Sequence, residues 1–84
     1  MTIRITRSTE GKAAVLRIEG RLNADTVPDL EKECRSAEPP LRLDLSGLSS
    51  ADKDGIQTLR RLSAEGAELF GTSPYVRQLL DTNS

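Results

Sequence analysis

The most constraining feature of this sequence is a strictly alternating run near its middle. Residues 41–45 read Leu-Arg-Leu-Asp-Leu, and a period of two is typical of a β-strand that buries one face. Pro39 and Pro40 stand directly before it and end any preceding helix. The centre of the chain is therefore predicted to be a strand whose three leucines point into the core.

A helix is predicted on each side of this strand. Asp25–Asp29 combines a capping residue, an early proline and an early carboxylate, which are signals of a helix start. Asp52–Gly55 opens the second helix, and Gly66 marks its end. The apolar face is formed by Val27, Leu30, Cys34 and Ala37 in the first helix and by Ile56, Leu59 and Leu62 in the second.

The ends of the chain supply the remaining elements. Residues 2–7 and 13–19 read as an antiparallel strand hairpin with a turn at 10–12, and Gly20 is expected to close its second strand. Ser46–Ala51 is expected to be a polar loop. Residues 67–70 read as a fourth strand, 71–74 as a turn, and Val76, Leu79 and Leu80 as the inner face of a last helix, with a frayed end at 82–84.

The predicted fold class is therefore α/β, with the order β-β-α-β-α-β-α and a mixed four-stranded sheet covered by helices. The 84 residues are enough for one modest core. Because no repeat, linker or composition shift interrupts the chain, we expect a single domain over residues 1–84.

Composition argues against several classes of function. The chain has no histidine and only one cysteine, Cys34, which argues against a disulfide, a zinc site or an imidazole base. We expect Cys34 to be a buried small apolar residue rather than a reactive thiol. A net charge of -1 and only two aromatic residues argue against nucleic-acid binding. Without a long apolar stretch that could serve as a signal or membrane span, the expected location is the cytoplasm.

Four segments of the chain resemble the STAS domain family of anti-sigma factor antagonists. Leu41–Leu48 is similar to the family's strand that ends in D-L-S, and Ala51–Ile56 to its D-S-S-G at a helix start. Leu16–Asn23 is similar to the strand followed by G-x-L-D, and Gly71–Leu80 to the final turn and helix. The resemblance covers roughly residues 13–81, with a second helix shorter than usual and without the customary C-terminal tail.

The resemblance implies a STAS fold and a switch at the D-S-S-G segment. In the family a serine there is phosphorylated by a partner kinase that is also an anti-sigma factor. Asp52 and Gly55 retain the motif, but Lys53 and Asp54 replace both serines. Asp54 has no hydroxyl, so a Ser/Thr kinase cannot phosphorylate this position.

Three interpretations of Asp54 stay open at this point. It can stabilise the helix N-terminus through its negative charge, it can imitate a phosphorylated serine, or it can suit a partner with a differently shaped surface. Ser49 and Ser50, in the expected loop, are alternative sites of modification. Lys53 is expected to be solvated but remains a candidate contact. Gly55 is expected to allow a tight turn or a close approach.

We therefore expect a non-catalytic protein-binding module that docks through residues 46–56, with Asp52, Lys53 and Asp54 setting charge complementarity. The resemblance implies an anti-sigma factor or kinase-like partner, or alternatively the ATPase of an ABC-type lipid transporter. No cofactor is expected. Gly11-Lys12 lacks the pattern of a phosphate loop, and Asp52 with Asp54 lacks further oxygen ligands for a metal ion.

Overall fold

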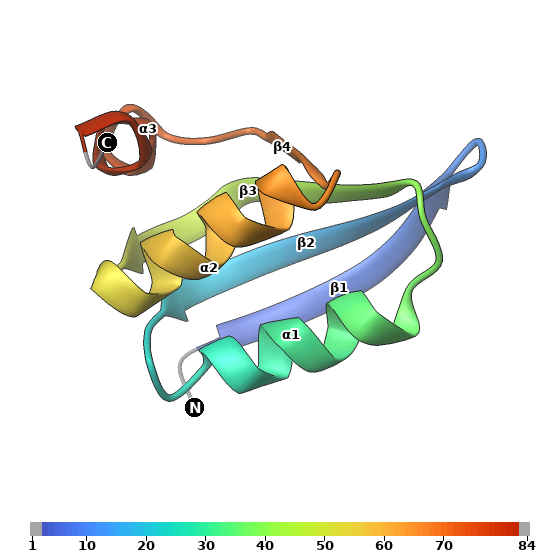
Figure 1. Cartoon of the computed structure of the whole chain (residues 1–84), viewed down its shortest axis with the longest axis horizontal. Helices are drawn as coiled ribbons and strands as arrows, with labels where there is room; N and C mark the ends of the chain where they lie inside the picture. The colour runs from blue at the N-terminus through green and yellow to red at the C-terminus, as the bar shows by residue number, and fades with distance from the viewer. Residues whose placement is uncertain (1–2, 83–84) are drawn as a thin grey trace.

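The elements follow one another along the chain in the predicted order (Figure 1). The computed structural model describes residues 3–82. Its elements are β1 (Ile3–Glu10), β2 (Ala13–Leu22), α1 (Val27–Ser36), β3 (Leu41–Ala51), α2 (Lys53–Ala64), β4 (Glu68–Phe70) and α3 (Pro74–Thr82). Of the three residues that were expected to be frayed, Thr82 belongs to α3, and residues 83–84 lie outside the described part.

The four strands form one mixed sheet in the order β1-β2-β3-β4. The hairpin strands β1 and β2 are antiparallel, whereas β3 joins β2, and β4 joins β3, in parallel. Parallel neighbours need crossover connections, which are right-handed in nearly all proteins. Two such crossovers in the same direction place α1 and α2 on the same face of the sheet, as Figure 1 shows. Thr6 and Arg17, which pair across β1 and β2 on the opposite face, are exposed.

The core lies between this sheet and the helices. Leu43 and Leu45 of the alternating strand are fully buried, as predicted, while Leu41 is half-buried. Burial of each such side chain contributes about 1.5 to 3 kcal/mol. Helices supply the other side of the core through residues that include Leu30, Ile56, Leu59, Leu62 and Val76.

Three of the predicted strand ends are wrong. The first strand, β1, does not end at Arg7 but continues to Glu10, because residues 8–10 pair with residues 13–15 of β2. Gly20 does not close β2, which continues to Leu22, and Ser46–Ala51 is not a loop but the second half of β3. The β2–β3 register shifts near Gly20, whose φ of 102° suits glycine. These irregularities let both strands continue beyond the glycine, and Leu48 and Ala51 become part of the core.

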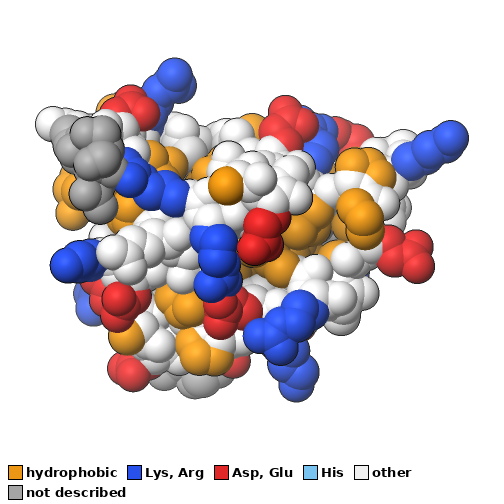
Figure 2. Space-filling model, in the orientation of Figure 1, with side chains coloured by type: hydrophobic (Ala, Val, Ile, Leu, Met, Phe, Trp, Pro, Cys, Tyr) orange, Lys and Arg blue, Asp and Glu red, His pale blue; other side chains and the backbone are white. Residues whose placement is uncertain are grey.

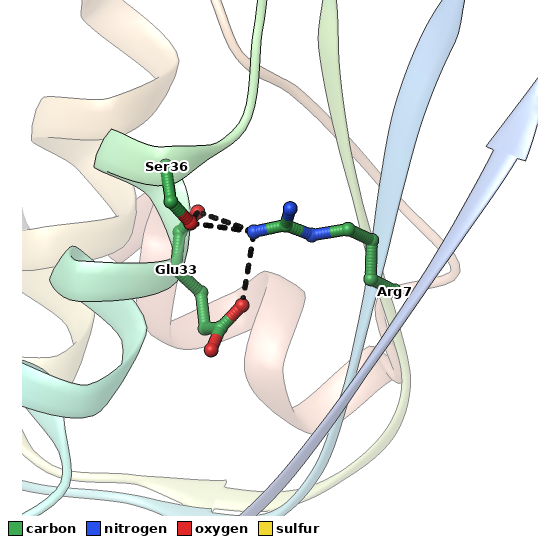
Figure 3. A network of polar contacts seen from close by, with 3 residues as sticks. All are labelled: Arg7, Glu33 and Ser36. Atoms are coloured by element: carbon green, nitrogen blue, oxygen red, sulfur yellow. Dashed lines mark hydrogen bonds and ion pairs between the residues drawn. The ribbon is translucent and has the colours of Figure 1, made fainter.

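An arginine on the edge strand fastens the end of α1 to the sheet (Figure 3). The Arg7 guanidinium donates to the Glu33 carbonyl oxygen at 3.3 Å, to the Glu33 carboxylate at 3.1 Å and to the Ser36 hydroxyl at 2.6 Å. Carbonyl groups in the last turn of a helix have no partner within the helix. Arg7 therefore stabilises this turn and fixes α1 over β1.

No helix between residues 3 and 82 is both long and apolar enough to cross a membrane. On the helix face of the molecule, hydrophobic side chains reach the surface in small areas between charged ones (Figure 2).

Candidate functional site

The predicted switch segment lies where β3 ends and α2 begins, beside the end of β2. Asp52 stands between the two elements as the N-cap of α2. Its backbone N–H donates to the Leu22 carbonyl oxygen at 3.0 Å, so the end of β3 is still joined to β2. The site is thus assembled by two adjacent strand ends and one helix start.

The Asp52 carboxylate joins two segments that are distant in sequence. One oxygen, Oδ1, accepts a hydrogen bond from the Gly55 backbone N–H at 2.9 Å, which is the usual N-cap bond. The other oxygen, Oδ2, accepts from the backbone N–H of Ala24 at 3.3 Å, in the connection between β2 and α1. Asp52 was expected to set charge complementarity with a partner, but its carboxylate is engaged within the chain.

Gly55 allows the first turn of α2 to touch the end of β2. A Cβ atom at this position would lie 2.5 Å from the Leu22 carbonyl oxygen and 3.1 Å from its carbonyl carbon. These contacts are to backbone, which cannot move aside as a flexible side chain can. The expected close-approach role of Gly55 therefore has a definite neighbour, Leu22.

Asp54 and Lys53 lie on the first turn of α2 and are exposed. Within residues 3–82, the Asp54 carboxylate has no hydrogen-bond or ion-pair partner. Only its backbone takes part in such a contact, because the carbonyl oxygen accepts from the Thr58 hydroxyl at 2.9 Å. The capping bond is thus made by Asp52, and the charge of Asp54 faces solvent.

The two candidate serines, Ser49 and Ser50, are in β3 and not in a loop as predicted. The Ser49 hydroxyl donates to the Gly20 carbonyl oxygen at 2.8 Å. Ser50 is half-buried and opposite Arg21 in β2. A phosphate on Ser49 would therefore break a contact at the irregular part of the β2–β3 pairing.

The connection between β2 and α1 is a functional candidate that the sequence did not single out. The Asn23 side-chain oxygen accepts from the backbone N–H of Asp25 at 2.9 Å and of Thr26 at 3.1 Å. The Thr26 hydroxyl is buried, accepts from the Asn23 N–H at 2.8 Å and donates to the Arg21 carbonyl at 3.0 Å. Asn is a common turn former, but only the structure places this turn beside Asp52.

The Asp44-Leu45-Ser46 segment of β3 has a local structural role. One Asp44 oxygen, Oδ1, accepts from the Ser46 backbone N–H at 3.0 Å. This bond, together with the Ser46 hydroxyl and the charge of Arg17, lowers the pKa of Asp44 below its usual value. Gly71 packs against the same carboxylate, because a Cβ there would lie 2.8 Å from Oδ1.

Cys34 lies at the other end of the molecule, in a cavity of about 260 Å³ between the ends of α1 and α2. Leu41, Leu62 and Ala67 also line it. Burial, and then the nearby carboxylates of Glu33 and Glu31, raise the pKa of the Cys34 thiol to about 11. Cys34 was expected to be buried, but it is only half-buried and lines this cavity.

No group of three or more potential metal ligands comes together within the part of the chain that the structure describes. The site therefore consists of backbone N–H groups, the Asp52 carboxylate that accepts hydrogen bonds from two of them, and the two exposed charged side chains of Lys53 and Asp54. Such an arrangement can present charge to another molecule.

A family model described as "Mlab, STAS domain" matches residues 5–81. Among solved structures, the STAS domain of an antisigma-factor antagonist from Rhodobacter sphaeroides is similar, with 20% identity over 83% of this chain and 87% of that chain and a TM-score of 0.67. The anti-sigma factor antagonist SpoIIAA in its unphosphorylated form is 17% identical over 92% of this chain and 79% of that chain, with a TM-score of 0.68. These two likenesses show the fold. No curated protein sequence matches the chain.

Proposed function

This chain belongs to the STAS domain family, and from that premise we propose that it is a non-catalytic regulatory module that binds a protein partner in the manner of an anti-sigma factor antagonist. The partner is an anti-sigma factor or kinase-like protein of the cytoplasm. Residues 1–84 act as one domain, and the docking surface contains the start of α2 with Lys53 and Asp54.

The observation that carries this proposal is the division of work between two carboxylates. Asp52 caps α2 through its bond to the Gly55 N–H, so the helix does not need Asp54 for that bond. Asp54 is exposed on the first turn, and by the resemblance of Asp52–Gly55 to D-S-S-G it corresponds to the family's phosphorylated serine. This supports a role for its charge in recognition.

Asp54 acts in this proposal as a built-in substitute for phosphoserine. A carboxylate carries one negative charge, whereas a phosphoserine carries about 1.5 to 2 at neutral pH. A partner that distinguishes the modified from the unmodified family member by charge then meets a chain fixed near the modified state. The helix N-terminus tolerates this charge because its free N–H groups favour anions.

The test is affinity purification from the native cell with the wild-type chain, Asp54→Ser and Asp54→Ala, followed by mass spectrometry of the bound proteins. Asp29→Ser is the matched control, because Asp29 is also exposed in the first turn of a helix. We expect the wild type and the control to recover an anti-sigma factor kinase weakly, both Asp54 variants to recover clearly more of it, and the introduced serine to carry a phosphate.

Equal recovery of that kinase with all four chains would contradict the phosphoserine substitution and leave the binding function. Recovery of no anti-sigma factor or kinase-like protein with any chain would contradict the antagonist function itself.

A second candidate function is an accessory subunit of an ABC-type lipid transport ATPase. It is favoured by the family model that matches, which is the Mlab type of STAS domain. The same purification distinguishes the two candidates, because this one predicts an ABC ATPase among the bound proteins of the wild-type chain.

A further inference from the structure

We propose that the cavity between the C-terminal ends of α1 and α2 is a binding site for a short apolar carboxylic acid. The hydrocarbon chain of the acid enters the cavity, and its carboxylate lies at the mouth beside Arg35. This inference does not rest on the proposed function, because the cavity and the switch segment lie at opposite ends of α2.

The walls of the cavity are mostly apolar and small. α1 and α2 run in the same direction, so their C-terminal ends lie on the same side of the molecule (Figure 1). Cysteine and alanine side chains on these walls are too short to fill the space between the helix ends. The apolar side chains that line the cavity are Cys34, Ala37, Pro39, Leu41, Leu62 and Ala67.

The volume of the cavity sets the size of the ligand. The space is about 260 Å³. An apolar cavity of about 150 Å³ holds a benzene-sized molecule, whereas drug-sized ligands occupy about 300 Å³ or more. A ligand with about six to eight carbon atoms falls between these limits. Each buried methylene group then strengthens binding about fourfold, which makes the chain the main source of affinity.

The charge at the mouth decides the polar group of the ligand. Arg35 lines the cavity and is exposed in the last turn of α1. Within residues 3–82 its guanidinium has no hydrogen-bond or ion-pair partner, and this planar group suits the geometry of a carboxylate. The acidic side chains at the same end already lie in ion pairs, which are Glu33 with Arg7 and both Glu31 and Glu65 with Arg61.

The interior of the cavity fixes the direction of the ligand. Burial, and then the carboxylates of Glu33 and Glu31, raise the pKa of the Cys34 thiol to about 11. The same burial and the same carboxylates disfavour any other anion beside the thiol. The carboxylate of the ligand therefore stays at Arg35, and its apolar end points towards Cys34.

The experiment is a titration of the purified chain followed by NMR of the backbone amides. Hexanoate should shift the amide signals of Cys34 and Ala67 in a saturable way, with a dissociation constant of about 1 mM, as is typical of so small a ligand. Butanoate has a shorter chain and should bind about tenfold more weakly. Hexanol lacks the charge and hexylamine has the opposite charge, so both should bind about threefold to fivefold more weakly, since an exposed ion pair contributes no more than that.

Arg35→Gln tests the polar group of the ligand. It should reduce the affinity for hexanoate about threefold to fivefold and leave the affinity for hexanol unchanged. Arg77→Gln is the matched control, because Arg77 is exposed on α3 and its substitution removes the same charge away from the cavity. This control should leave both affinities unchanged.

Two further variants fill the cavity from its two walls. Cys34→Leu and Ala67→Leu each add apolar atoms where the hydrocarbon chain lies, and they should weaken hexanoate binding about tenfold or more. If one of them folds poorly, the other serves, and urea unfolding identifies the variant whose stability stays near that of the wild type. Ala64→Leu is the control that should bind as the wild type does, because Ala64 is exposed in the last turn of α2, outside the cavity lining.

Absence of saturable shifts with hexanoate would overturn the inference, and so would shifts confined to amides away from the cavity. Unchanged hexanoate binding in Arg35→Gln, or hexylamine that binds as tightly as hexanoate, would rule out a carboxylic acid as the ligand. Unchanged binding in the filled variants would place the site elsewhere on the molecule. None of these measurements uses a protein partner, so their failure is distinct from the failure of the proposed function.

Discussion

The two ends of α2 are built in different ways. At the C-terminal end, the Gly66 N–H donates to the Ser63 carbonyl at 3.1 Å and the Ala67 N–H to the Leu62 carbonyl at 3.0 Å, which is a Schellman closure made by the local backbone. At the N-terminal end, the Asp52 carboxylate binds Ala24 from another segment. The C-terminal end is closed by local backbone bonds, whereas the N-terminal end combines a local cap bond from Gly55 with a bond from the distant residue Ala24.

The charged side chains at the two ends of α2 also differ, because those at the C-terminal end are paired and those at the N-terminal end are exposed. Near the C-terminal end, Arg61 pairs with Glu31 of α1 and approaches Glu65 at 3.9 Å. On the first turn, Asp54 and Lys53 are exposed, and within residues 3–82 Asp54 has no ion-pair partner. The end that depends on tertiary contacts is thus also the end whose charges remain available to a partner.

The largest difference in stability is expected between substitutions of Gly55, in the first turn of α2, and of Gly66, just after its last turn. Gly55→Ala should lower the free energy of unfolding by about 2 to 3 kcal/mol, because its Cβ would meet the Leu22 backbone at 2.5 Å. Gly66→Ala should lower it by about 1 kcal/mol, because φ is 112° but no atom lies within 4 Å of the new Cβ. Urea unfolding of both variants measures the difference.

Equal losses for the two variants would show that the approach of Gly55 to β2 is easily relaxed. The contact of Gly55 with the end of β2 would then not distinguish the N-terminal end of α2 from the C-terminal end.

The same contrast explains what the sequence could predict. The order of elements and the core leucines could be predicted from the hydrophobic repeat, which is about two residues in strands and about 3.6 in helices. The helix start at Asp52 could be predicted from its capping signal. The extension of β3 over Ser46–Ala51 could not, because it depends on pairing with β2 across shifted registers. The same holds for Ala24, which joins the site through a hydrogen bond to a residue 28 positions away.

For the candidate site residues, too, the sequence predicted local features but not contacts between distant segments. Asp52 and Gly55 were recognisable from the motif, but their contacts with Ala24 and Leu22 were not. Ser49 was placed in a loop because serines are common in turns, whereas its hydroxyl holds Gly20 in the neighbouring strand. Local preference is overruled here by cross-strand pairing.

A smaller difference in the free energy of unfolding is expected between alanine substitutions of Asp52 and Asp54. Asp52→Ala should lower the free energy of unfolding by about 1 to 2 kcal/mol, because the N-cap bond and the bond from Ala24 are both lost. Asp54→Ala should change it by less than about 0.5 kcal/mol, since only the weak attraction of an exposed charge to the helix end is removed. Thermal or urea unfolding of the pair is sufficient, and an Asp54 loss as large as the Asp52 loss would assign the capping role to the wrong residue.

The smallest effect belongs to Cys34, near the self-contained end of α2. Its pKa is raised to about 11, with burial as the main cause. A free thiol ionises near pH 8.5. Between roughly pH 8.5 and pH 11 the unfolded chain therefore loses the thiol proton while the folded chain keeps it. The thiol therefore favours unfolding as pH rises through this window and has no such effect below it. At pH 9.5 the loss should stay below about 1 kcal/mol, because the thiol is only partly shielded from solvent. Urea unfolding at pH 7.5 and 9.5 should show that the free energy of unfolding falls less for Cys34→Ala than for the wild type. An equal fall in both chains would mean that the thiol ionises as freely in the folded chain as in the unfolded chain.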